Sequence, residues 1–282
     1  MHSHPKPLSL ALFFLLFFFL YLPVPSRAAE PYTFGVVPQF EQRKLYAVWK
    51  PIIDELQKRT GLAFKLVTTL QIQDYEKELA KGTFDFIYVN PYHVIKLWRT
   101  QGYAPLVCDK TPLRGILVVK KDGPIRTLAD LNGKTVAFPS PNALGASLVM
   151  RAELDQLHRV RITPLYVKTH SSVYLHVVQG LASAGGGVEK TLQEQGPQVR
   201  DALRVLYTSR ALPSHPIAAH ARVKKQDAAA VRAALLAMGR DPVAKELLAK
   251  VPMKEVVGTS IGSYLPMEAW GLEKYWQTIE GE

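Results

Sequence analysis

Short apolar runs alternate with segments of helical periodicity in the part of the chain that follows residue 30. Within residues 45–59 apolar side chains recur every three or four positions, and Gly61 follows as a helix stop. Residues 84–89 are mostly apolar, as expected of a strand buried on both faces of a parallel sheet. We predict strands at 32–37, 64–67 and 84–89 and helices at 45–59, 74–81 and 91–98. This βαβαβα order favours a parallel sheet with helices on both faces.

The same alternation returns further along the chain. The predicted strands are 115–120, 135–138, 165–168, 204–207 and 217–219, and the predicted helices are 128–131, 143–156, 173–181, 189–194, 227–238 and 243–250. The aromatic tail, which contains Tyr264, Trp270, Tyr275 and Trp276, is expected to pack on the first unit. Periodicity leaves two architectures open: two sequential domains, or two lobes that are joined by two crossing strands.

The first residues of the chain have the layout of a secretory signal. A weakly basic start with Lys6 precedes an apolar run from Leu8 to Leu22, and the small residues Ser26, Ala28 and Ala29 follow. We predict cleavage after Ala28, hence a periplasmic location. The alternative, an uncleaved membrane anchor, would need about 20 apolar residues, and this run is shorter. No later segment of the sequence is apolar enough to span a membrane.

The charge and the cysteine count exclude some classes of protein. The net charge of +11 falls to +9 without the predicted signal, and the basic residues are spread singly and in pairs, so we expect no nucleic-acid binding. Cys108 is the only cysteine, so the chain has no internal disulfide. Its thiol is expected to be a small buried hydrophobe, although the sequence does not fix its state.

Polar residues follow several predicted strands at the position where ligands bind in open α/β sheets, beyond the carboxyl ends. These turns are residues 88–92, 140–145, 168–172 and 184–189. Helix N-termini expose unpaired N–H groups and a partial positive charge, so they attract anions. Several such turns around one cleft, with hydroxyl groups and a histidine, would suit a phosphate-like group.

Each feature also has a simpler interpretation. Asn90 and Ser171 would serve as helix caps, and the run of glycines at 185–187 would be a flexible connection. His170 and His176 are six residues apart and do not share a helical face, so we predict no metal site and no cofactor. Glu189 and His170 lack a nearby nucleophile, and the chain has no nucleophile-elbow motif, so we predict that it is not an enzyme.

Several segments together resemble the phosphonate, phosphate and phosphite branch of the periplasmic solute-binding proteins of ABC importers. The markers are residues 34–38, 49–53, 74–75, 85–90, 141–142, His170, Glu189 and 213–216, and their order and spacing carry the resemblance. The resemblance implies the type 2 periplasmic binding protein fold: an α/β protein of two lobes, each a mostly parallel sheet flanked by helices, joined by two crossing strands. It places residues 30–115 and 212–282 in lobe 1 and 116–211 in lobe 2.

The resemblance also implies roles for individual residues. Tyr75 and Tyr88 match ligand-contacting tyrosines of the first lobe, His170 matches an anion-binding histidine of the second lobe, and Glu189 matches an acidic ligand contact. The full set of candidate ligand-binding residues is Tyr75, Tyr88, Asn90, Asn142, Ala143, Leu144, Gly145, His170, Ser171, Ser172, Glu189 and His215.

Two departures from the family bear on the ligand. Where related phosphonate binders have a Ser-Thr-Ser run, this chain has Ala143, Leu144 and Gly145, which offer only backbone N–H groups. Ser147, Ser171 and Ser172 are candidates to compensate. His215 replaces an aspartate that resembles an amine-recognising group, which argues against an aminophosphonate.

These observations predict a monomeric periplasmic protein that captures a small oxyanion, such as phosphate, phosphonate, phosphite or a relative, between its lobes for an ABC permease. The alternative is a ligand-sensing protein that presents its closed form to a membrane sensor kinase or cyclase.

Overall fold

A computed structural model describes residues 1–2 and 30–278, and the fold concerns the unit that begins at Pro31. Apart from its first two residues, the predicted signal peptide lies outside the described residues. Of the helices in the described part of the chain, none combines the length and the apolar character that crossing a bilayer requires.

Six strands form the first sheet. β1 (Tyr32–Val36), β2 (Phe64–Thr68) and β3 (Phe86–Tyr88) pair in parallel, with β1 in the middle. Beyond β3 the sheet continues with β10 (Pro216–Ala219), β4 (Ala104–Asp109) and β11 (Val256–Gly258). β10 runs antiparallel to β3 and β4, and β11 runs antiparallel to β4, so the four strands from the first part of the chain share one direction.

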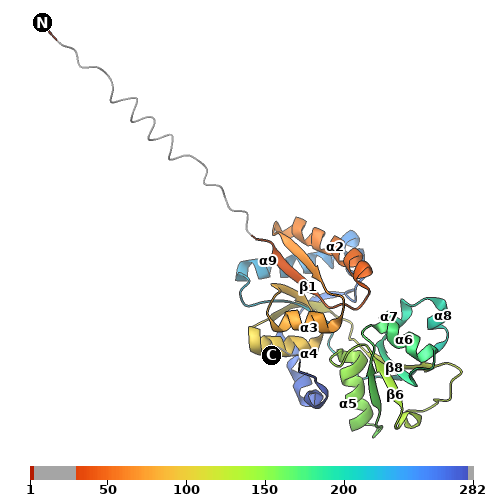
Figure 1. Cartoon of the computed structure of the whole chain (residues 1–282). Coiled ribbons are helices and arrows are strands. Elements are labelled where there is room, and N and C mark those ends of the chain that lie inside the picture. Colours follow the sequence, from red (N-terminus) through yellow and green to blue (C-terminus); the bar gives the residue numbers. More distant parts are fainter. Residues whose placement is uncertain (3–29, 279–282) are drawn as a thin grey trace. The chain divides into compact units, whose positions relative to one another are not determined.

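Five helices accompany this sheet: α2 (Gln42–Thr60), α3 (Ile72–Ala80), α4 (Pro91–Gln101), α9 (Lys225–Met238) and α10 (Pro242–Leu248). In Figure 1, α3 and α4 lie on the opposite side of β1 from α2 and α9. The apolar stripe predicted for α2 is buried at Leu45, Trp49, Ile52, Ile53 and Leu56. Burial of each such side chain stabilises the fold by roughly 1.5–3 kcal/mol, so this face fixes the helix to the sheet.

Two strands of the first sheet, β4 and β11, were not predicted from the sequence. β4 contains Pro105, which has no N–H for a ladder, and the register of its partner β10 shifts between Ile217 and Ala218, opposite this proline. β11 is only three residues long and pairs with the distant β4. Long-range antiparallel pairing, which local periodicity does not report, stabilises both strands.

Five strands form the second sheet, in the order β7, β6, β8, β5 and β9. The strands are β5 (Gly115–Lys120), β6 (Thr135–Phe138), β7 (Thr163–Tyr166), β8 (Ala184–Val188) and β9 (Leu203–Thr208). Of these five strands, only β5 is antiparallel to the others. The helical segments of this part are η2 (Ala129–Leu131), η3 (Leu144–Leu148), α5 (Val149–Gln156), α6 (His170–Val178), α7 (Glu189–Gln193) and α8 (Pro197–Arg200).

The glycine run at 185–187 is neither a turn nor a flexible connection, so both interpretations of the sequence were wrong. It forms the middle of β8, the central strand of the second sheet. A Cβ on Gly186 would lie 1.9 Å from the carbonyl oxygen of Ala146, and a Cβ on Gly187 would lie 2.2 Å from the hydroxyl of Tyr174. The strand is therefore made of glycine because η3 and α6 approach its backbone too closely for a side chain.

The start of α6 also differs from the prediction. The helix begins at His170 instead of residue 173, because the side chain of Thr169 accepts a hydrogen bond from the Ser172 amide and caps it. The preceding strand, β7, correspondingly starts at Thr163 and not at residue 165.

Two chain segments connect the sheets. Leu113 and Leu212 form an isolated antiparallel bridge, with N–H to O distances of 2.9 and 2.8 Å in the two directions. The first sheet draws its strands from residues 32–109 and 216–258, and the second draws its strands from 115–208. This is the predicted fold class: two mostly parallel sheets with flanking helices, joined by two crossing segments.

The aromatic tail packs on the first core, as predicted. It comprises η4 (Ile261–Ser263), η5 (Leu265–Trp270) and η6 (Leu272–Tyr275). Tyr264 is fully buried in that core, and the ring of Trp276 lies 4.8 Å from the ring of His93. The tail also contacts the second part of the molecule, because the Tyr275 hydroxyl donates to Asp155 on α5 at 2.5 Å.

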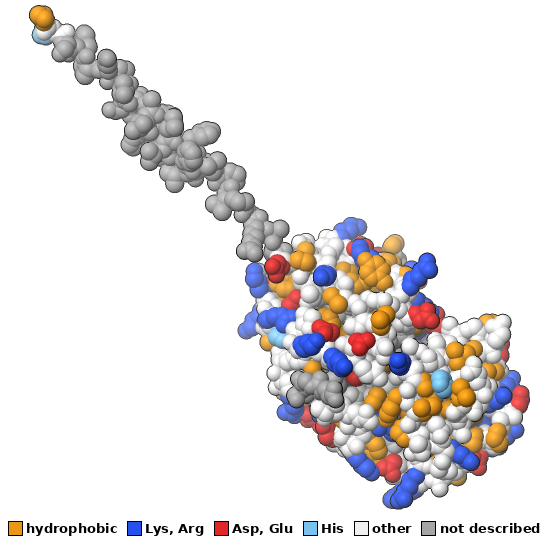
Figure 2. Space-filling model, in the orientation of Figure 1, with side chains coloured by type: hydrophobic (Ala, Val, Ile, Leu, Met, Phe, Trp, Pro, Cys, Tyr) orange, Lys and Arg blue, Asp and Glu red, His pale blue; other side chains and the backbone are white. Residues whose placement is uncertain are grey.

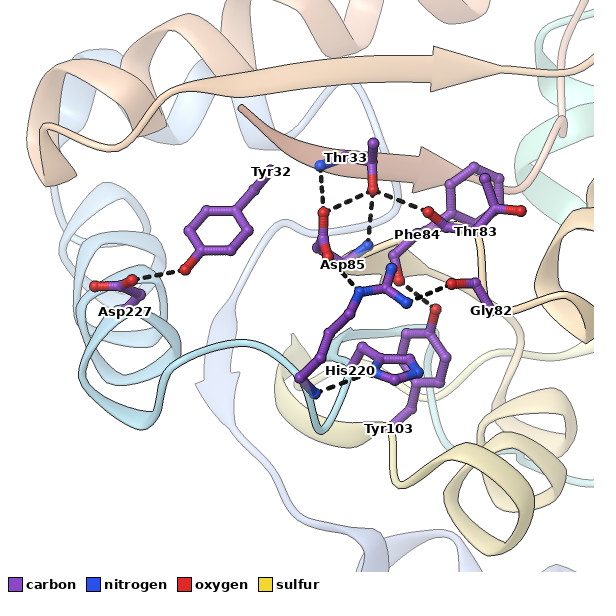
Figure 3. A network of polar contacts seen from close by, with 10 residues as sticks. Tyr32, Thr33, Gly82, Thr83, Phe84, Asp85, Tyr103, His220 and Asp227 are labelled. Carbon is purple, nitrogen blue, oxygen red and sulfur yellow. Dashed lines mark hydrogen bonds and ion pairs between the residues drawn. The ribbon is translucent and has the colours of Figure 1, made fainter. Parts of the chain in front are cut away.

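A polar network lies at the amino end of the first sheet. Figure 3 shows Asp85, just before β3, accepting hydrogen bonds from the backbone N–H and the hydroxyl of Thr33, both at 2.8 Å. Arg222 donates to the same carboxylate at 2.6 Å, and together these contacts lower the pKa of Asp85 against the effect of burial. The network joins β1, β3 and the segment after β10 at the end opposite the candidate site.

Candidate functional site

A cavity of about 30 Å³ lies between the loops of the two sheets. Six of its lining residues were predicted from the sequence: Asn90, Ala143, Leu144, Gly145, His170 and His215. The other six were not: Val37, Gln39, Ile72, Leu113, Ala146 and Val188. Several of these residues follow the carboxyl ends of parallel strands, which is where open α/β sheets bind ligands.

His170 enters the cavity from the second sheet, as the first residue of α6. Its Nδ1 lies 3.4 Å from the hydroxyl of Thr191, which in turn lies 2.7 Å from the hydroxyl of Tyr174. The Thr191 hydroxyl donates to the Val188 carbonyl at 2.9 Å, so it accepts from the Nδ1–H of His170 and leaves Nε2 of the neutral ring as an acceptor. Burial lowers the pKa of His170 to about 4, so the ring is neutral at pH 7.

His215 enters from the segment before β10. Its ring stacks on the ring of Tyr88 at 5.3 Å, and its Nε2 lies 3.4 Å from the side-chain nitrogen of Gln39. Burial, with smaller contributions from His93 and His170, lowers the pKa of His215 to about 3. The cavity therefore holds two neutral imidazoles, one contributed by each side.

Asn90 lines the cavity, but its side chain is largely engaged elsewhere. Its Oδ1 accepts hydrogen bonds from the Tyr92 and His93 amides and so caps α4. Its Nδ2 contacts Nδ1 of His93 and donates to the Asn142 carbonyl at 3.3 Å. Asn90 therefore caps α4, which was the simpler interpretation of this residue. The same side chain also bonds to the loop after β6.

Ala143, Leu144 and Gly145 lie at the start of η3, a wide π-type turn that continues into α5. The Ala143 carbonyl accepts from both Ser147 and Leu148, at 2.8 and 3.0 Å. The first N–H groups of a helix lack partners within it, so this end brings backbone donors and a partial positive charge to the cavity. π-Type turns occur frequently at functional sites.

The two tyrosines do not line the cavity. Tyr75 is buried, and its hydroxyl donates to the Tyr88 carbonyl at 3.1 Å while its ring stacks on Phe84. The Tyr88 ring lies between Trp49 and His215, and its buried hydroxyl has no hydrogen-bond partner among the described residues. Tyr75 therefore supports β3, whereas Tyr88 supports His215 and keeps an unused donor.

The remaining predicted residues lie outside this cavity. Asn142 makes two hydrogen bonds with the backbone of Gln277 in the tail, at 2.9 and 3.0 Å. Ser172 belongs to the cap of α6, where its hydroxyl lies 2.9 Å from that of Thr169. Ser171 does not line the cavity. The hydroxyl of Ser147 accepts a hydrogen bond from the Arg151 guanidinium. Glu189 is exposed and accepts from Gln193.

Of the six residues that the sequence analysis missed, Ala146 and Val188 lie in segments that it had singled out, the helix predicted at 143–156 and the turn at 184–189, and the other four form two pairs. Val37 and Gln39 come directly after β1, so the rule that ligands bind at the carboxyl ends of strands pointed to them. Ile72 and Leu113 gave no such signal, because they enter the cavity only through the packing of one sheet against the loops of the other.

The described residues contain no group of three or more His, Cys, Asp or Glu side chains arranged to hold a metal ion. Cys108 is a free, half-buried thiol on β4. Figure 2 shows acidic and basic side chains interspersed over the face that it presents.

Comparison with known proteins agrees with this architecture. Residues 34–264 match the family model described as the phosphonate periplasmic substrate-binding protein of ABC transporters. No match was found among curated proteins. The binding component of an ABC phosphonate transporter from Pseudomonas aeruginosa aligns with a TM-score of 0.78 at 15% identity, covering 86% of each chain.

Two further solved structures are similar. PhnD1 from Prochlorococcus marinus in complex with methylphosphonate has a TM-score of 0.77 at 13% identity, and 86% of this chain and 97% of that one are covered. A chloride-bound protein from Xanthomonas citri has a TM-score of 0.72 at 16% identity, with coverage of 86% and 98%. At these identities the likeness concerns the fold.

The family model covers most of the chain, and the family is one of transport components and not of enzymes. This favours import over the sensing alternative, and it implies a small-molecule ligand, a permease partner and a periplasmic location. The chain belongs to the phosphonate-type periplasmic substrate-binding proteins and captures a solute for an ABC importer.

Proposed function

We propose that the chain binds a small oxyanion, such as phosphate, phosphonate, phosphite or a relative, in the cavity between two lobes. Lobe 1 comprises residues 30–115 and 212–282, and lobe 2 comprises 116–211. The protein acts as a monomer in the periplasm after cleavage of the signal at residues 1–28, and it delivers the anion to its permease. The observation that carries this proposal is a cavity with two imidazoles and no carboxylate in its lining.

The anion would be held by donors from both lobes. His215 supplies the N–H of its neutral ring, His170 supplies an Nε2–H once it takes up a proton with the anion, and the start of η3 supplies backbone N–H groups and its helix dipole. The ring of Tyr88 does not line the cavity, but it stacks on the ring of His215 and so holds that imidazole in position. Hydrogen bonds to a charged group contribute about 1.5–3 kcal/mol each, so a few of them support micromolar binding.

Capture requires the lobes to separate. A cavity of about 30 Å³ has room for roughly two water molecules, and the two lobes contact each other beside it. Ile72 packs against Ala143 and Ala146, and Lys44 pairs with Glu194 at 2.6 Å. The two connections at Leu113 and Leu212 are the natural pivot. A ligand favours the closed arrangement by contacting both lobes at once.

The relatives support an anionic ligand. PhnD1 was solved with methylphosphonate, and structures of the Xanthomonas citri protein contain chloride or ATP. Each of these ligands is an anion.

Calorimetry of the mature protein against phosphate, phosphite, sulfate, methylphosphonate and phenylphosphonate tests the proposal. We expect at least one anion to bind, and we expect His170→Ala to weaken that binding at least tenfold, or about 1.4 kcal/mol. His176→Ala is the matched control, because His176 lies on the same helix, contacts the Ser172 carbonyl and does not line the cavity. No heat with any anion, or equal effects of the two substitutions, would refute the proposed site.

A further inference from the structure

A second and larger cavity of about 520 Å³ adjoins the first. Gln39, Leu113, Val188 and His215 line both cavities, so the two spaces meet at these side chains. Any ligand that places its acid group beside His215 therefore has the larger cavity next to it.

The volume of this second cavity greatly exceeds what an inorganic anion requires. An apolar cavity of about 150 Å³ already accommodates benzene, and pockets for organic molecules measure about 300–1,000 Å³. A substituent of many non-hydrogen atoms therefore fits beside the anion-binding donors. Methylphosphonate or phosphate would leave this space to water.

Much of the wall of the second cavity is apolar. Phe40 and Pro112 line one part of it, and Val251 and Pro252 of the segment before β11 line another. The ring of Phe40 is half-buried, and the Lys44 ammonium lies over it at 4.6 Å from the ring centroid. Such apolar surfaces favour an alkyl or aromatic group over a strongly hydrated one.

The charged groups around the second cavity disfavour an amine. The lining has three basic residues, Arg114, Lys190 and Lys254, against two acidic ones. The two oxygens of Asp109 already accept from the backbone N–H groups of Thr111 and Glu255, at 2.6 and 3.0 Å.

Glu189, the other acidic group, is exposed to solvent, where an ion pair with a ligand amine adds little. The buried His215 between the cavities is neutral and cannot hold an ammonium by charge.

Resting on the proposed function, we infer that the ligand is an organic oxyanion whose apolar, preferably aromatic, substituent occupies the second cavity while its acid group lies between His170 and His215. Arylphosphonates and aryl phosphate monoesters are the simplest members of this class. Phosphate, methylphosphonate and aminoalkylphosphonates would be weak ligands.

Calorimetry with a matched series of phosphate, methylphosphonate, 2-aminoethylphosphonate and phenylphosphonate tests the inference. We expect phenylphosphonate to bind at least tenfold more tightly than either of the other phosphonates. Equal or tighter binding of methylphosphonate or 2-aminoethylphosphonate would overturn this inference and leave the proposed function standing. No binding of any member would overturn both.

Substitutions of residues that line the second cavity test whether this cavity causes the preference for phenylphosphonate. Pro252→Trp fills the second cavity, so we expect it to weaken phenylphosphonate at least tenfold and to change methylphosphonate less than twofold. Val243→Trp, at an exposed position of α10, is the control for a bulky surface substitution. Phe40→Ala removes an aromatic wall without adding bulk and should act in the same selective way. Equal losses for both phosphonates would contradict the inference.

Discussion

Two histidines far apart in sequence determine the electrostatics of the small cavity. His170 and His215 are both buried, and burial holds their pKa values near 4 and 3 respectively, so neither carries charge at neutral pH. An anion between them would favour the protonated rings and raise both pKa values. Binding is therefore coupled to proton uptake.

The sign of this coupling gives a pH prediction. Because the pKa of His170 is about 4 in the free protein and higher in the complex, affinity should rise as pH falls from 7 toward 4.5. The gain approaches about tenfold per pH unit where one proton is taken up. Calorimetry at several pH values, corrected for the titration of the ligand itself, measures it. His170→Gln should flatten the profile, and an affinity that falls with acidity would contradict the coupling.

At this scale the structure brings some of the predicted residues into one cavity and places others outside it. The resemblance and the strand-end rule brought His170, His215 and Gly145 to one cavity. Tyr75 was predicted as a ligand contact, but its hydroxyl is used to support the Tyr88 carbonyl. Thr191, which orients His170, gave no sequence signal, because its relation to that ring depends on how α6 packs on β8 and α7.

Among the elements, β8 is a strand whose glycine-rich sequence is typical of a loop, and close packing of its neighbours explains this composition. Its three consecutive glycines have low intrinsic strand preference, yet the strand lies at the centre of its sheet. The cost in chain entropy is offset by the close approach of η3 and α6, which bring Ala143 and His170 to the cavity. Sequence patterns predicted the amphipathic helices well because their information is local. They missed β4, β8 and β11 because distant partners define those strands.

This account predicts a large effect of one added methyl group. Gly186→Ala places a Cβ 1.9 Å from the Ala146 carbonyl oxygen, so η3 must shift, and overpacking of this kind destabilises a protein by roughly 1–3 kcal/mol. Gly262→Ala is the control, because the nearest atom to its new Cβ is 3.7 Å away. Thermal denaturation should show a clear loss for Gly186→Ala and little change for Gly262→Ala. Equal melting temperatures would contradict the packing argument.

Across the whole unit from Pro31 to residue 278, the tail is a third link between the two sheets. Asn142 bonds to Gln277, Lys274 pairs with Asp155, and the Trp276 ring packs on His93. Aromatic residues in the tail predicted its docking on the first core, but not its contacts with α5. These contacts depend on how distant segments pack together, and a local sequence pattern carries no information about that packing. For the same reason, the sequence did not predict the place of Ile72 in the small cavity or the presence of the larger cavity.

The central claim is that one anion contacts imidazoles from both lobes at the same time. It is tested most directly by NMR of imidazole nitrogens in ¹⁵N-histidine-labelled protein titrated with phenylphosphonate, with signals assigned from His170→Gln and His215→Gln variants. The account predicts that the signals of both rings shift together and follow one dissociation constant, while the His176 signal stays in place. Saturable binding that leaves the His170 and His215 signals unmoved would contradict it.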